Sequence, residues 1–515
     1  MKRVLYILST LLSFLGSCFS KTHSLHQARF AKTHELTSLV SHTFDGAGLL
    51  LGVSSFNQIL RVRPTKIRPE LGNALIVAPT RGGKGLLAVS QLLTWPHSVV
   101  VNDIKGELYD QTAGYRATLG LVFCLDPRGL GHCFDPLHTR TDEDELYAAA
   151  KNLLYEPHET EGKPFTERGI KMLTLMWLAA RKQNEHAYEP TRLLPFTRKL
   201  ADLGLNRAVP IIHAISPVLA TRMFDGEYIP EHDYTENKYL SSSWESLTAR
   251  LYPLLTEKIV RCFNGSDFTG ADIITSPRPI TLYLCWPESA LLAKAPLIRL
   301  VWESLIAEML DIYDKAKGQN RHPVLLLLDE AGTVTLPSLP QYVATVAGRG
   351  LSVWAAIQDL SQLELYGMHK ARTIKNNMDT QIYYRQASSE TAEYLERSLG
   401  KQSGFAHSQT LHDGQEASQG LSEHAVPLLT ARDINELNSD EIIAFFSNHK
   451  PFRAQRMDWQ AFPILTQRRA IAPPKLSTLP PLGTSLSTYS WRREEGRTKM
   501  RAIDPDDLNP YAKLN

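Results

Sequence analysis

Residues 75–85 read LIVAPTRGGKG, and this stretch decides the fold of the chain. Leu75, Ile76 and Val77 form a short apolar run suited to a buried parallel strand. A glycine-rich turn with a lysine follows, and Leu86–Val89 can start a helix. This layout is typical of a loop that binds nucleotide phosphates. Small residues let backbone N–H groups point inward, and the helix N-terminus adds positive dipole.

The loop departs at two positions from the usual GxxxxGK[ST] pattern. Ala78 stands where the first glycine is expected, and Gly85 stands where a serine or threonine normally holds magnesium. Lys84 keeps the position that reaches the β- and γ-phosphates. The alternative is a glycine-rich surface turn after a core strand. A second motif is needed to distinguish this turn from a phosphate-binding loop.

That second motif is the stretch 324–330, which reads VLLLLDE. Four consecutive leucines suit a strand buried on both faces, and two acids at its end belong at the ligand-facing edge of a parallel sheet. We expect Asp329 to bind magnesium, usually through water, and Glu330 to orient and deprotonate the attacking water. The alternative is a strand that ends in a solvated acidic turn, and the phosphate loop upstream disfavours it.

Composition sets the outer bounds on function. The 515 residues suggest more than one domain, and a hydrophobic content of 43% supports a sizeable core. A net charge of +2 does not by itself indicate nucleic acid or membrane binding. The five cysteines form no CxxC pair, which fits a reducing cytosol and argues against a disulfide scaffold or a zinc site.

A mostly apolar run, Val4–Phe19, follows Lys2 and Arg3. It is shorter than the ~20 residues that a membrane-spanning helix normally needs. A signal peptide, a short membrane anchor and a buried helix are the three interpretations. More basic residues follow the run than precede it, which favours an anchor with the larger C-terminal part in the cytoplasm.

The pattern along the chain divides into five parts. Residues 1–25 are the short hydrophobic N-terminal segment, and 26–141 alternate short apolar strands with helical patterns. Residues 142–263 carry apolar residues at helical spacing with little alternation, which predicts an all-α insertion. The α/β pattern resumes over 264–465, with a strand at Ile280–Cys285 and a long helix at about Leu297–Lys317.

Two later stretches have a composition that indicates irregular structure. Residues Ser403–His424 are rich in Ser, Gly, His and Gln, which predicts a mobile loop whose three histidines are solvated rather than metal-bound. Residues 466–515 are predicted as a Pro-rich linker and a basic flexible tail, and Ala472–Ser485 is the extended linker within them.

The order of the motifs resembles that of the type IV secretion coupling proteins, the TraG-like conjugal-transfer family of DNA-pump ATPases. The resemblance covers about His26 to Trp459. The segment Asp103-Ile104-Lys105-Gly106-Glu107 is its most specific part. The other motifs that carry it are Ala78–Gly85, Leu327–Glu330, Gly348–Ser352 and Ile357–Leu363.

The resemblance implies an α/β fold, with a RecA-like P-loop nucleotide-binding domain and an inserted all-α domain. It implies an ATPase that uses ATP and Mg2+ and forms a homo-hexamer at the cytoplasmic face of the bacterial inner membrane. Its partners would be relaxase–DNA complexes or secreted effector proteins, together with other type IV secretion components. Family members often carry Lys-Gly at the end of the loop, which accounts for Gly85. They usually have two membrane helices, so this chain has either a truncated start or a shortened form.

Within this resemblance, Lys84 is the expected charge partner of the phosphates, and Gly82, Gly83 and Gly85 give the backbone room. Thr80 and Arg81 are expected to contact nucleotide as well. The predicted nucleotide-binding stretch is Ala78, Pro79, Thr80, Arg81, Gly82, Gly83, Lys84, Gly85 and Leu86.

Three further predictions concern polar residues outside the loop. Gln358 ends an apolar strand and is expected to sense the γ-phosphate; the alternative is a bond to backbone. Arg349 is expected to reach the ATP of a neighbouring subunit; a surface arginine or a DNA phosphate contact is the alternative. Asp103, Lys105 and Glu107 receive no chemical role, and an internal ion pair is one interpretation.

Two other functions remain as alternatives to a secretion coupling ATPase. One is a soluble hexameric DNA translocase without a secretion role. The other is a non-hydrolysing cargo adaptor, although Lys84, Asp329, Glu330 and Gln358 are all present and argue against a dead site. DNA contact is predicted from the resemblance and not from charge, since the near-neutral chain shows no basic block.

Overall fold

The computed structural model describes residues 27–66, 70–154, 163–185, 191–287, 291–315, 322–333, 336–410, 418–447 and 449–482. The predicted anchor Val4–Phe19 and the basic tail from 483 onward lie outside the described residues. The chain forms two compact units. Unit 1 comprises residues 1–95 and 354–463, and unit 2 comprises 96–353 and 464–515.

Unit 1 is built on a mixed sheet whose centre is parallel. The strand that precedes the phosphate loop, β4 (Ala74–Val77), lies between β10 (Leu351–Ile357) and β11 (Thr380–Tyr383), and both pairings are parallel. Antiparallel strands continue the sheet beyond β11. They are β14 (Glu441–Phe446), β15 (Phe452–Gln455), β2 (Leu49–Val53), β3 (Ile59–Val62) and β1 (Val40–Ser41).

Every residue of β4 is buried, as the run Leu75–Val77 predicts for a central parallel strand. The helices of unit 1 follow the parallel strands at their carboxyl ends. They are α2 (Lys84–Leu92) after β4, η5 (Leu360–Tyr366) and α14 (Met368–Asn376) after β10, and α15 (Ser389–Leu399) after β11. Short elements complete the unit, namely η1 (Thr33–Leu39), α16 (Ala431–Asn435) and η6 (Trp459–Ala461).

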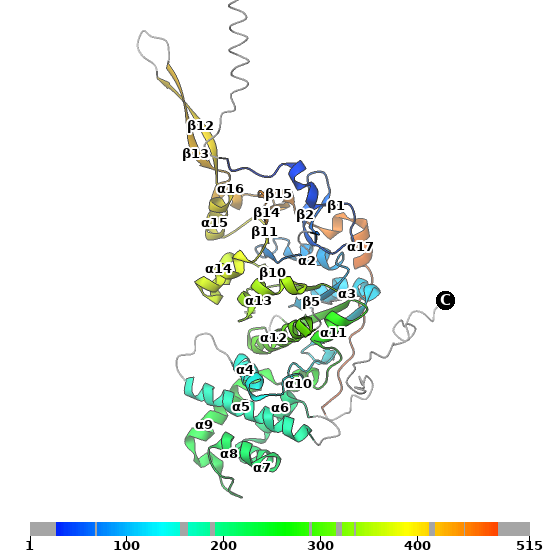
Figure 1. Ribbon diagram of the computed structural model, residues 1–515, viewed down its shortest axis with the longest axis vertical. Coiled ribbons are helices and arrows are strands. Elements are labelled where there is room, and N and C mark those ends of the chain that lie inside the picture. Colours follow the sequence, from blue (N-terminus) through cyan, green and yellow to red (C-terminus); the bar gives the residue numbers. More distant parts are fainter. Residues whose placement is uncertain are drawn as a thin grey trace, which may run out of the picture. The chain divides into compact units, whose positions relative to one another are not determined.

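The prediction of a mobile loop at Ser403–His424 is wrong for its described part, and residues 411–417 lie outside the described residues. Strands β12 (Lys401–Thr410) and β13 (Ser418–Pro427) pair along their full length as an antiparallel hairpin, which Figure 1 shows as a long ribbon beside α15 and α16. A two-stranded ribbon is held by cross-strand backbone hydrogen bonds and needs no apolar face. Composition therefore carried no signal for it.

Unit 2 contains the second parallel group of strands. Strand β5 (Ser98–Asp103) pairs in parallel with β9 (Val324–Leu328) and with β8 (Ile280–Cys285), and β8 pairs in parallel with β6 (Leu121–Asp126). All residues of β5, β8 and β9 are buried. A short antiparallel strand, β7 (Leu130–Gly131), follows β6.

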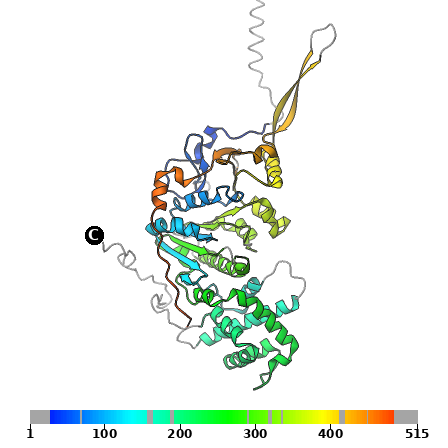
Figure 2. The same ribbon diagram turned by 180° about the vertical axis from the view of Figure 1, so that it is seen from behind.

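Between β7 and β8 the described residues of unit 2 form helices and no strand. Figure 2 shows most of this helical run, in cyan and green, gathered together. The bounds 142–263 of a separate domain stay a prediction. The helices are α4 (Glu143–Leu154), α5 (Lys163–Asn184), α6 (Leu193–Leu203), α7 (Leu205–Ile215), α8 (Pro217–Phe224), η2 (Tyr234–Glu236), α9 (Lys238–Leu254), α10 (Glu257–Cys262) and α11 (Gly270–Thr275).

Unit 2 also contains one long helix and several shorter ones. The long helix predicted at about Leu297–Lys317 is α12, which begins six residues earlier and runs over Leu291–Lys315 with Pro296 in its first turns. The others are α3 (Glu107–Leu119), α13 (Leu339–Thr345), η4 (Ala347–Arg349) and α17 (Pro463–Arg469).

The stretch predicted as an extended linker is extended over its described part and packs on unit 2. The Tyr109 hydroxyl donates to the Pro474 carbonyl (2.7 Å), and the Leu479 N–H donates to the Gly129 carbonyl (2.8 Å). Gly114 in α3 lies so close that a Cβ there would be 2.1 Å from the Ile471 carbonyl oxygen. Proline-rich backbone can pack in this way because it has few N–H donors that need partners and is already extended.

Candidate functional site

The phosphate loop of unit 1 is a tight turn fixed at its base. The buried Ala78 donates its N–H to the Ile357 carbonyl of β10 (3.0 Å), so the first loop position continues the sheet. Gly82 donates to the Pro79 carbonyl (2.8 Å). Between them Arg81 has φ 62°, a left-handed conformation that side chains other than glycine seldom adopt. Strained backbone of this kind is concentrated at ligand sites.

The loop glycines do not all serve the same purpose. Gly83 has φ 109°, and a Cβ there would lie 3.3 Å from Tyr384 Cε1 and 3.4 Å from Arg456 Cδ. A side chain at Gly83 is therefore disfavoured by conformation and by space. Gly85 has no such constraint, because a Cβ there meets no atom within 4 Å. Packing therefore does not require a glycine at position 85, although Gly85 was expected to give the backbone room.

Helix α2 presents an N-terminus suited to an anion. Lys84 is its first residue, and no side chain caps the helix at Gly83. The backbone N–H groups of the first turn and the helix dipole are the features that bind phosphate at helix N-termini. The other end is held in place by Gln91, whose amide accepts from the Leu50 N–H (2.8 Å) and donates to the Gly48 carbonyl (2.9 Å).

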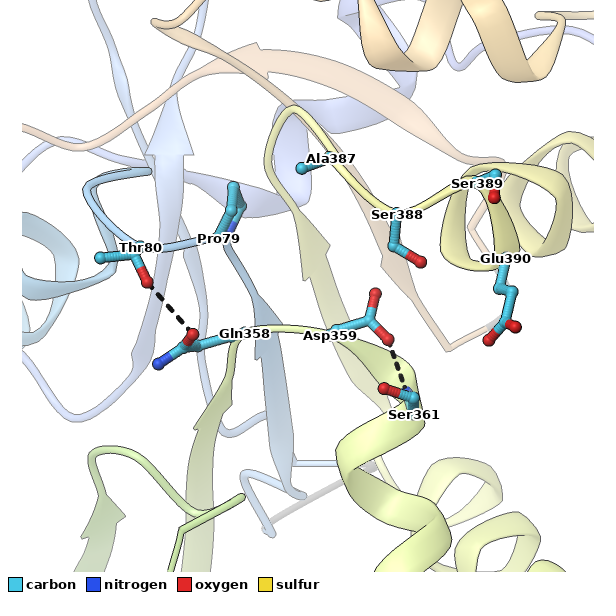
Figure 3. Close-up of a pocket in the computed structure, with 9 residues that line it drawn as sticks. All are labelled: Pro79, Thr80, Gln358, Asp359, Ser361, Ala387, Ser388, Ser389 and Glu390. Atoms are coloured by element: carbon cyan, nitrogen blue, oxygen red, sulfur yellow. Dashed lines mark hydrogen bonds between the residues drawn. The ribbon is translucent and has the colours of Figure 1, made fainter.

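Two predicted residues meet at the carboxyl edge of β4 and β10. The Thr80 hydroxyl in the loop donates to Gln358 Oε1 at 3.1 Å, the contact drawn in Figure 3. Gln358 follows the last residue of β10, and its N–H donates to Gln362 Oε1 in η5 (2.7 Å). Gln358, the predicted γ-phosphate sensor, therefore contacts the phosphate loop and is hydrogen-bonded to η5.

A cavity of about 740 Å³ opens beside this contact. It lies at the carboxyl ends of β4, β10 and β11, where ligands bind in parallel α/β sheets. Figure 3 shows its walls, which are formed by the loop, by the start of η5 and by the start of α15. Its lining residues are Pro79, Thr80, Gln358, Asp359, Ser361, Ala387, Ser388, Ser389 and Glu390.

Asp359 is a fixed negative charge in this cavity. Its carboxylate accepts from the Ser361 N–H (2.8 Å) and from the Thr391 hydroxyl (2.7 Å). Burial alone would raise the pKa of Asp359, but hydrogen bonds from Ser361, Thr391 and Ser388 outweigh it and hold this pKa below its ordinary value. Asp359 is therefore ionised at neutral pH and can accept hydrogen bonds from a bound molecule.

Sequence reasoning missed the part of the cavity that α15 contributes. Ser388 is the N-cap of α15 and accepts from the Thr391 N–H (3.4 Å), and Ser389 and Glu390 follow it. The usable signal was the strand Thr380–Tyr383 followed by a serine pair before a helical pattern. Such a signal marks a strand end, but it does not say which strands are neighbours in the sheet.

The two acids of the second motif lie in unit 2. Asp329 and Glu330 directly follow the buried strand β9, and both side chains are half-buried. Asn102 at the end of β5 donates from Nδ2 to the Asp329 carbonyl oxygen (3.0 Å), which links the two strand ends. Glu330 has φ 59°, so it adopts the same uncommon backbone conformation as Arg81.

Asp103, in the most family-specific segment, caps a helix. It is buried, and its carboxylate accepts the Tyr109 N–H (2.7 Å) in the first turn of α3. Burial raises the pKa of Asp103 to about 6, against the opposing effect of these backbone hydrogen bonds. The Cys285 thiol donates to the same carboxylate oxygen, Oδ2, at 3.9 Å. Lys105 and Glu107 are both exposed.

Arg349 is engaged within its own unit. Its guanidinium donates to both carboxylate oxygens of Asp314 near the end of α12, at 3.0 and 3.3 Å. The neighbouring Gly348 carbonyl accepts from the Tyr313 hydroxyl (3.0 Å). The Arg349 and Asp314 side chains keep 34% and 55% of their surfaces accessible to solvent. An exposed pair of this kind is weak, so another anion can compete for Arg349.

Among the residues that the structure describes, no helix is both long and apolar enough to cross a bilayer.

Comparison with known proteins identifies relatives in bacterial DNA transfer. The family model for type IV secretory system conjugative DNA transfer matches residues 57–478. Protein VirD4 of Agrobacterium fabrum is 25% identical over 421 residues, which are 75% of this chain and 58% of that protein. The conjugal transfer protein TraG of Escherichia coli is 27% identical over 354 residues, 64% of this chain and 55% of TraG. The chain thus spans under three fifths of the length of these two relatives.

Solved structures show the same fold. The bacterial conjugative coupling protein TrwBdeltaN70, in complex with sulphate, superposes with a TM-score of 0.60 at 17% identity, covering 84% of this chain and 94% of that one. The plasmid coupling protein TrwB in complex with ADP and Mg2+ gives 0.57 at 16% identity, covering 89% and 96%. The predicted α/β class with a RecA-like sheet is confirmed. The resemblance inferred from the motifs is confirmed as well, and the chain belongs to the type IV secretory system conjugative DNA transfer family.

Proposed function

We propose that this chain is an ATP-hydrolysing coupling protein that recruits relaxase–DNA or protein substrates to a type IV secretion channel and drives their transfer. The observation that carries the proposal is the phosphate loop of unit 1. An uncapped helix N-terminus begins with Lys84, and Gln358 from the neighbouring strand contacts the loop through Thr80. Loop, cation and sensor are the parts that a nucleotide-driven motor needs.

The nucleotide would use both the loop and the cavity. Its phosphates fit the N–H groups of α2 and the Lys84 ammonium. Its ribose fits the cavity, because the carboxylates of Asp359 and Glu390 can accept hydrogen bonds from sugar hydroxyls. The related TrwB has been solved with ADP and Mg2+ and with ATP and GTP analogues, which supports a nucleoside triphosphate at this position.

Each predicted residue has a distinct task in hydrolysis. Lys84 would balance charge on the β- and γ-phosphates, and Glu330 would orient the attacking water and take its proton. Asp329 would hold Mg2+, whose charge offsets that of the phosphates when bound. A carboxylate together with phosphate oxygens is the ligand set that Mg2+ prefers. Gln358 would relay the presence of the γ-phosphate to η5 through its N–H bond to Gln362.

Assembly would complete the site. In a homo-hexamer, Arg349 would exchange its exposed partner Asp314 for the γ-phosphate of a neighbouring subunit. The helical run of unit 2 would bind cargo. The segment 1–25 would attach the chain to the cytoplasmic face of the inner membrane, beside other type IV secretion components. The family match supports the DNA-transfer role, and these finer assignments belong to the proposal.

Steady-state ATP hydrolysis by the full chain tests the proposal, measured with and without single- and double-stranded DNA. We expect hydrolysis that DNA stimulates, and we expect Lys84→Ala to reduce it by about 100-fold or more, because charge on the transferring phosphate loses its partner. The matched control is Lys199→Ala, an exposed lysine of α6, which should match the wild type. Equal rates for Lys84→Ala and wild type would refute the assigned site.

A further inference from the structure

An arginine outside the sequence motifs lies against the phosphate loop. Arg456 directly follows β15, which is separated from β4 by β14 and β11 in the sheet of unit 1. Because β14 runs antiparallel to β11 and β15 runs antiparallel to β14, β15 points in the same direction as β4. The carboxyl ends of β4 and β15 therefore lie at the same edge of the sheet, which is the edge where the phosphate loop begins.

The space beside Gly83 is bounded by Arg456 and Tyr384. A Cβ added at Gly83 would lie 3.4 Å from Cδ and 3.5 Å from Nη1 of Arg456, and 3.3 Å from Cε1 of Tyr384. The guanidinium thus lies beside the glycine that directly precedes Lys84. In phosphate loops the backbone N–H groups hold the α- and β-phosphates, while the lysine reaches the β- and γ-phosphates. An arginine beside Gly83 is therefore placed for the α- and β-phosphates.

The charge of Arg456 is not neutralised by a carboxylate. Within the described part of the chain, its guanidinium makes one hydrogen bond, from Nη1 to the Ser439 carbonyl (3.2 Å), and forms no ion pair. Its backbone N–H donates to the Asp440 carbonyl (2.6 Å), which fixes the start of the side chain. A guanidinium has five N–H donors in a planar fork that suits two phosphate oxygens. Most of these donors therefore remain for a ligand.

Tyr384 supplies a second observation at the same place. Its N–H donates to the Val77 carbonyl (3.0 Å), so this residue continues β11 beside the end of β4. The side chain is 2% exposed, and among the described residues its hydroxyl has no hydrogen-bond partner. Burial raises the pKa of Tyr384, and the nearby charge of Arg456 opposes this shift. A buried hydroxyl without a partner is uncommon in proteins, and a phosphate oxygen beside Gly83 would accept its hydrogen bond.

We propose that Arg456 binds the α- and β-phosphates of the nucleotide and that the Tyr384 hydroxyl donates to one of the same oxygens. The inference deepens the function proposed above and rests on it, since it adds a second cation to that nucleotide site. Lys84 serves the β- and γ-phosphates, so the two cations divide the triphosphate between them. Because ADP and ATP share the α- and β-phosphates, Arg456 holds both nucleotides and contributes to binding rather than to the hydrolytic step.

The other part of a nucleotide that suits a guanidinium is the base, on which its plane can stack. The position beside Gly83 favours phosphate, because this glycine belongs to the turn whose N–H groups gather phosphate oxygens. Two competitors distinguish these assignments. Adenosine carries the base without phosphate, and pyrophosphate carries phosphates without the base.

The test compares Arg456→Gln and Arg456→Lys with the wild-type full chain. Titration with fluorescent ADP and with a fluorescent non-hydrolysable ATP analogue measures the Kd values. We expect Arg456→Gln to weaken binding of both by roughly 10-fold, because charge-assisted hydrogen bonds to phosphate are lost, and Arg456→Lys to recover part of the affinity. Unchanged Kd values in Arg456→Gln would overturn the inference.

The matched control is Arg453→Gln. It removes an arginine of β15 itself, whose guanidinium pairs with Glu441 (2.5 Å). This variant should bind both nucleotides as the wild type does.

Displacement of fluorescent ADP identifies the part of the nucleotide that Arg456 contacts. We expect Arg456→Gln to raise the Ki of pyrophosphate by about 10-fold and to leave the Ki of adenosine unchanged. The opposite pattern would assign Arg456 to the base and overturn the inference. A loss of affinity confined to the ATP analogue would assign Arg456 to the γ-phosphate and overturn it as well.

Tyr384→Phe tests the hydroxyl alone. We expect the Kd for ADP to rise by about 3-fold, as for the loss of one hydrogen bond. Thermal denaturation without nucleotide is the control, since the hydroxyl has no partner among the described residues and its removal should not lower the Tm. An unchanged Kd for ADP would remove Tyr384 from the site.

Steady-state hydrolysis separates this inference from the proposed function. We expect Arg456→Gln to raise the KM for ATP by about 10-fold while kcat changes by less than about twofold, whereas Lys84→Ala lowers kcat. Equal KM values for Arg456→Gln and wild type would overturn the inference while the ATPase proposal stands. A wild type that binds ADP through Arg456 but hydrolyses no ATP would overturn the ATPase proposal alone.

Discussion

Glu330 carries its carboxylate on a backbone with φ 59°, directly after a fully buried strand. Such a conformation costs about 1 to 3 kcal/mol for a residue other than glycine. Arg81 in the phosphate loop has φ 62°. The two uncommon conformations thus fall within the two motifs expected to handle nucleotide, which is where stored strain is usually found.

Replacing Glu330 with glutamine should separate binding from turnover. The amide keeps the size of the side chain but cannot accept the proton of water, so we expect nucleotide to bind with unchanged affinity and hydrolysis to fall by about 100- to 1000-fold. Fluorescent-nucleotide titration and a phosphate-release assay measure the two quantities. Glu245→Gln on α9 is the matched control, and a Glu330→Gln variant that turns over normally would remove Glu330 from the role of base.

Single residues show which roles can be predicted from the local sequence and which cannot. The strand, the turn and Lys84 of the loop lie within one short stretch, so their order alone indicated the site. The role of Asp103 was not readable, because its partner is the backbone of a helix that begins several residues later. Charge alone left an internal ion pair as one interpretation, whereas the structure shows a buried carboxylate that accepts the Tyr109 N–H and the Cys285 thiol.

At the scale of the element, α12 carries a buried acid. Glu308 is 8% exposed, and its Oε2 accepts the N–H of Gly270 at the start of α11 (2.8 Å). Its other oxygen lies 3.6 Å from Nδ1 of His138. Burial raises the pKa of Glu308 from 4.5 to about 7, and the neighbouring His138 only partly opposes this shift.

The sign of this shift sets a pH dependence. Between pH 4.5 and 7 the folded chain holds a proton that the unfolded chain has released, so Glu308 favours folding less and less as pH rises through 7. Glu308→Gln removes this penalty. We expect the variant to be more stable than wild type at pH 8, by on the order of 1 to 3 kcal/mol, with the difference shrinking toward pH 5.

Urea denaturation at pH 8, 6.5 and 5 measures the difference in the free energy of unfolding. Asp311→Asn is the matched control, since Asp311 is an exposed acid of the same helix whose removal should give no comparable trend. A difference that grows as the pH falls would contradict the assignment of the shift to burial of Glu308.

Elements with a strong apolar period were predicted well, and the others were not. Strand β8 has the bounds Ile280–Cys285 that its apolar run indicates. The hairpin of β12 and β13 was missed because every cross-strand pair contains at least one polar residue and the strands are joined by backbone hydrogen bonds. The linker Ala472–Ser485 was predicted as extended, but its sequence did not reveal the contacts with α3 and Gly129 that hold its described part, residues 472–482.

At the scale of the whole molecule, the helical run of unit 2 exposes large apolar side chains. Val218 on α8 and Tyr252 on α9 are 67% and 72% exposed. Removing the region is a poor test of its role, because α4 and α9 pack on α12 and the Cys262 carbonyl accepts the Phe134 N–H (2.8 Å). A deletion would expose these buried surfaces and destabilise the remainder.

Surface substitution keeps the fold and tests cargo binding directly. We expect Val218→Ser/Tyr252→Ser to weaken binding of a cognate relaxase by roughly 10-fold, since exposed aromatic and aliphatic anchors carry much of an interface's affinity, and to leave ATP hydrolysis unchanged. Biolayer interferometry with immobilised relaxase measures the affinity. Phe56→Ser, an exposed apolar residue of unit 1, is the control. Undiminished relaxase binding would locate the cargo surface elsewhere.

The sequence by itself determined the phosphate loop, the acidic strand end, the α/β class and the family, because each of these is written in a contiguous stretch of residues. The tertiary structure decided which stretches, distant in the sequence, together line the cavity beside the phosphate loop. The cavity needs the ends of β4, β10 and β11 side by side, and Thr80 is linked to η5 through Gln358 and Gln362. Sheet order depends on long-range pairing, and a local pattern of apolar residues does not encode which strand becomes whose neighbour.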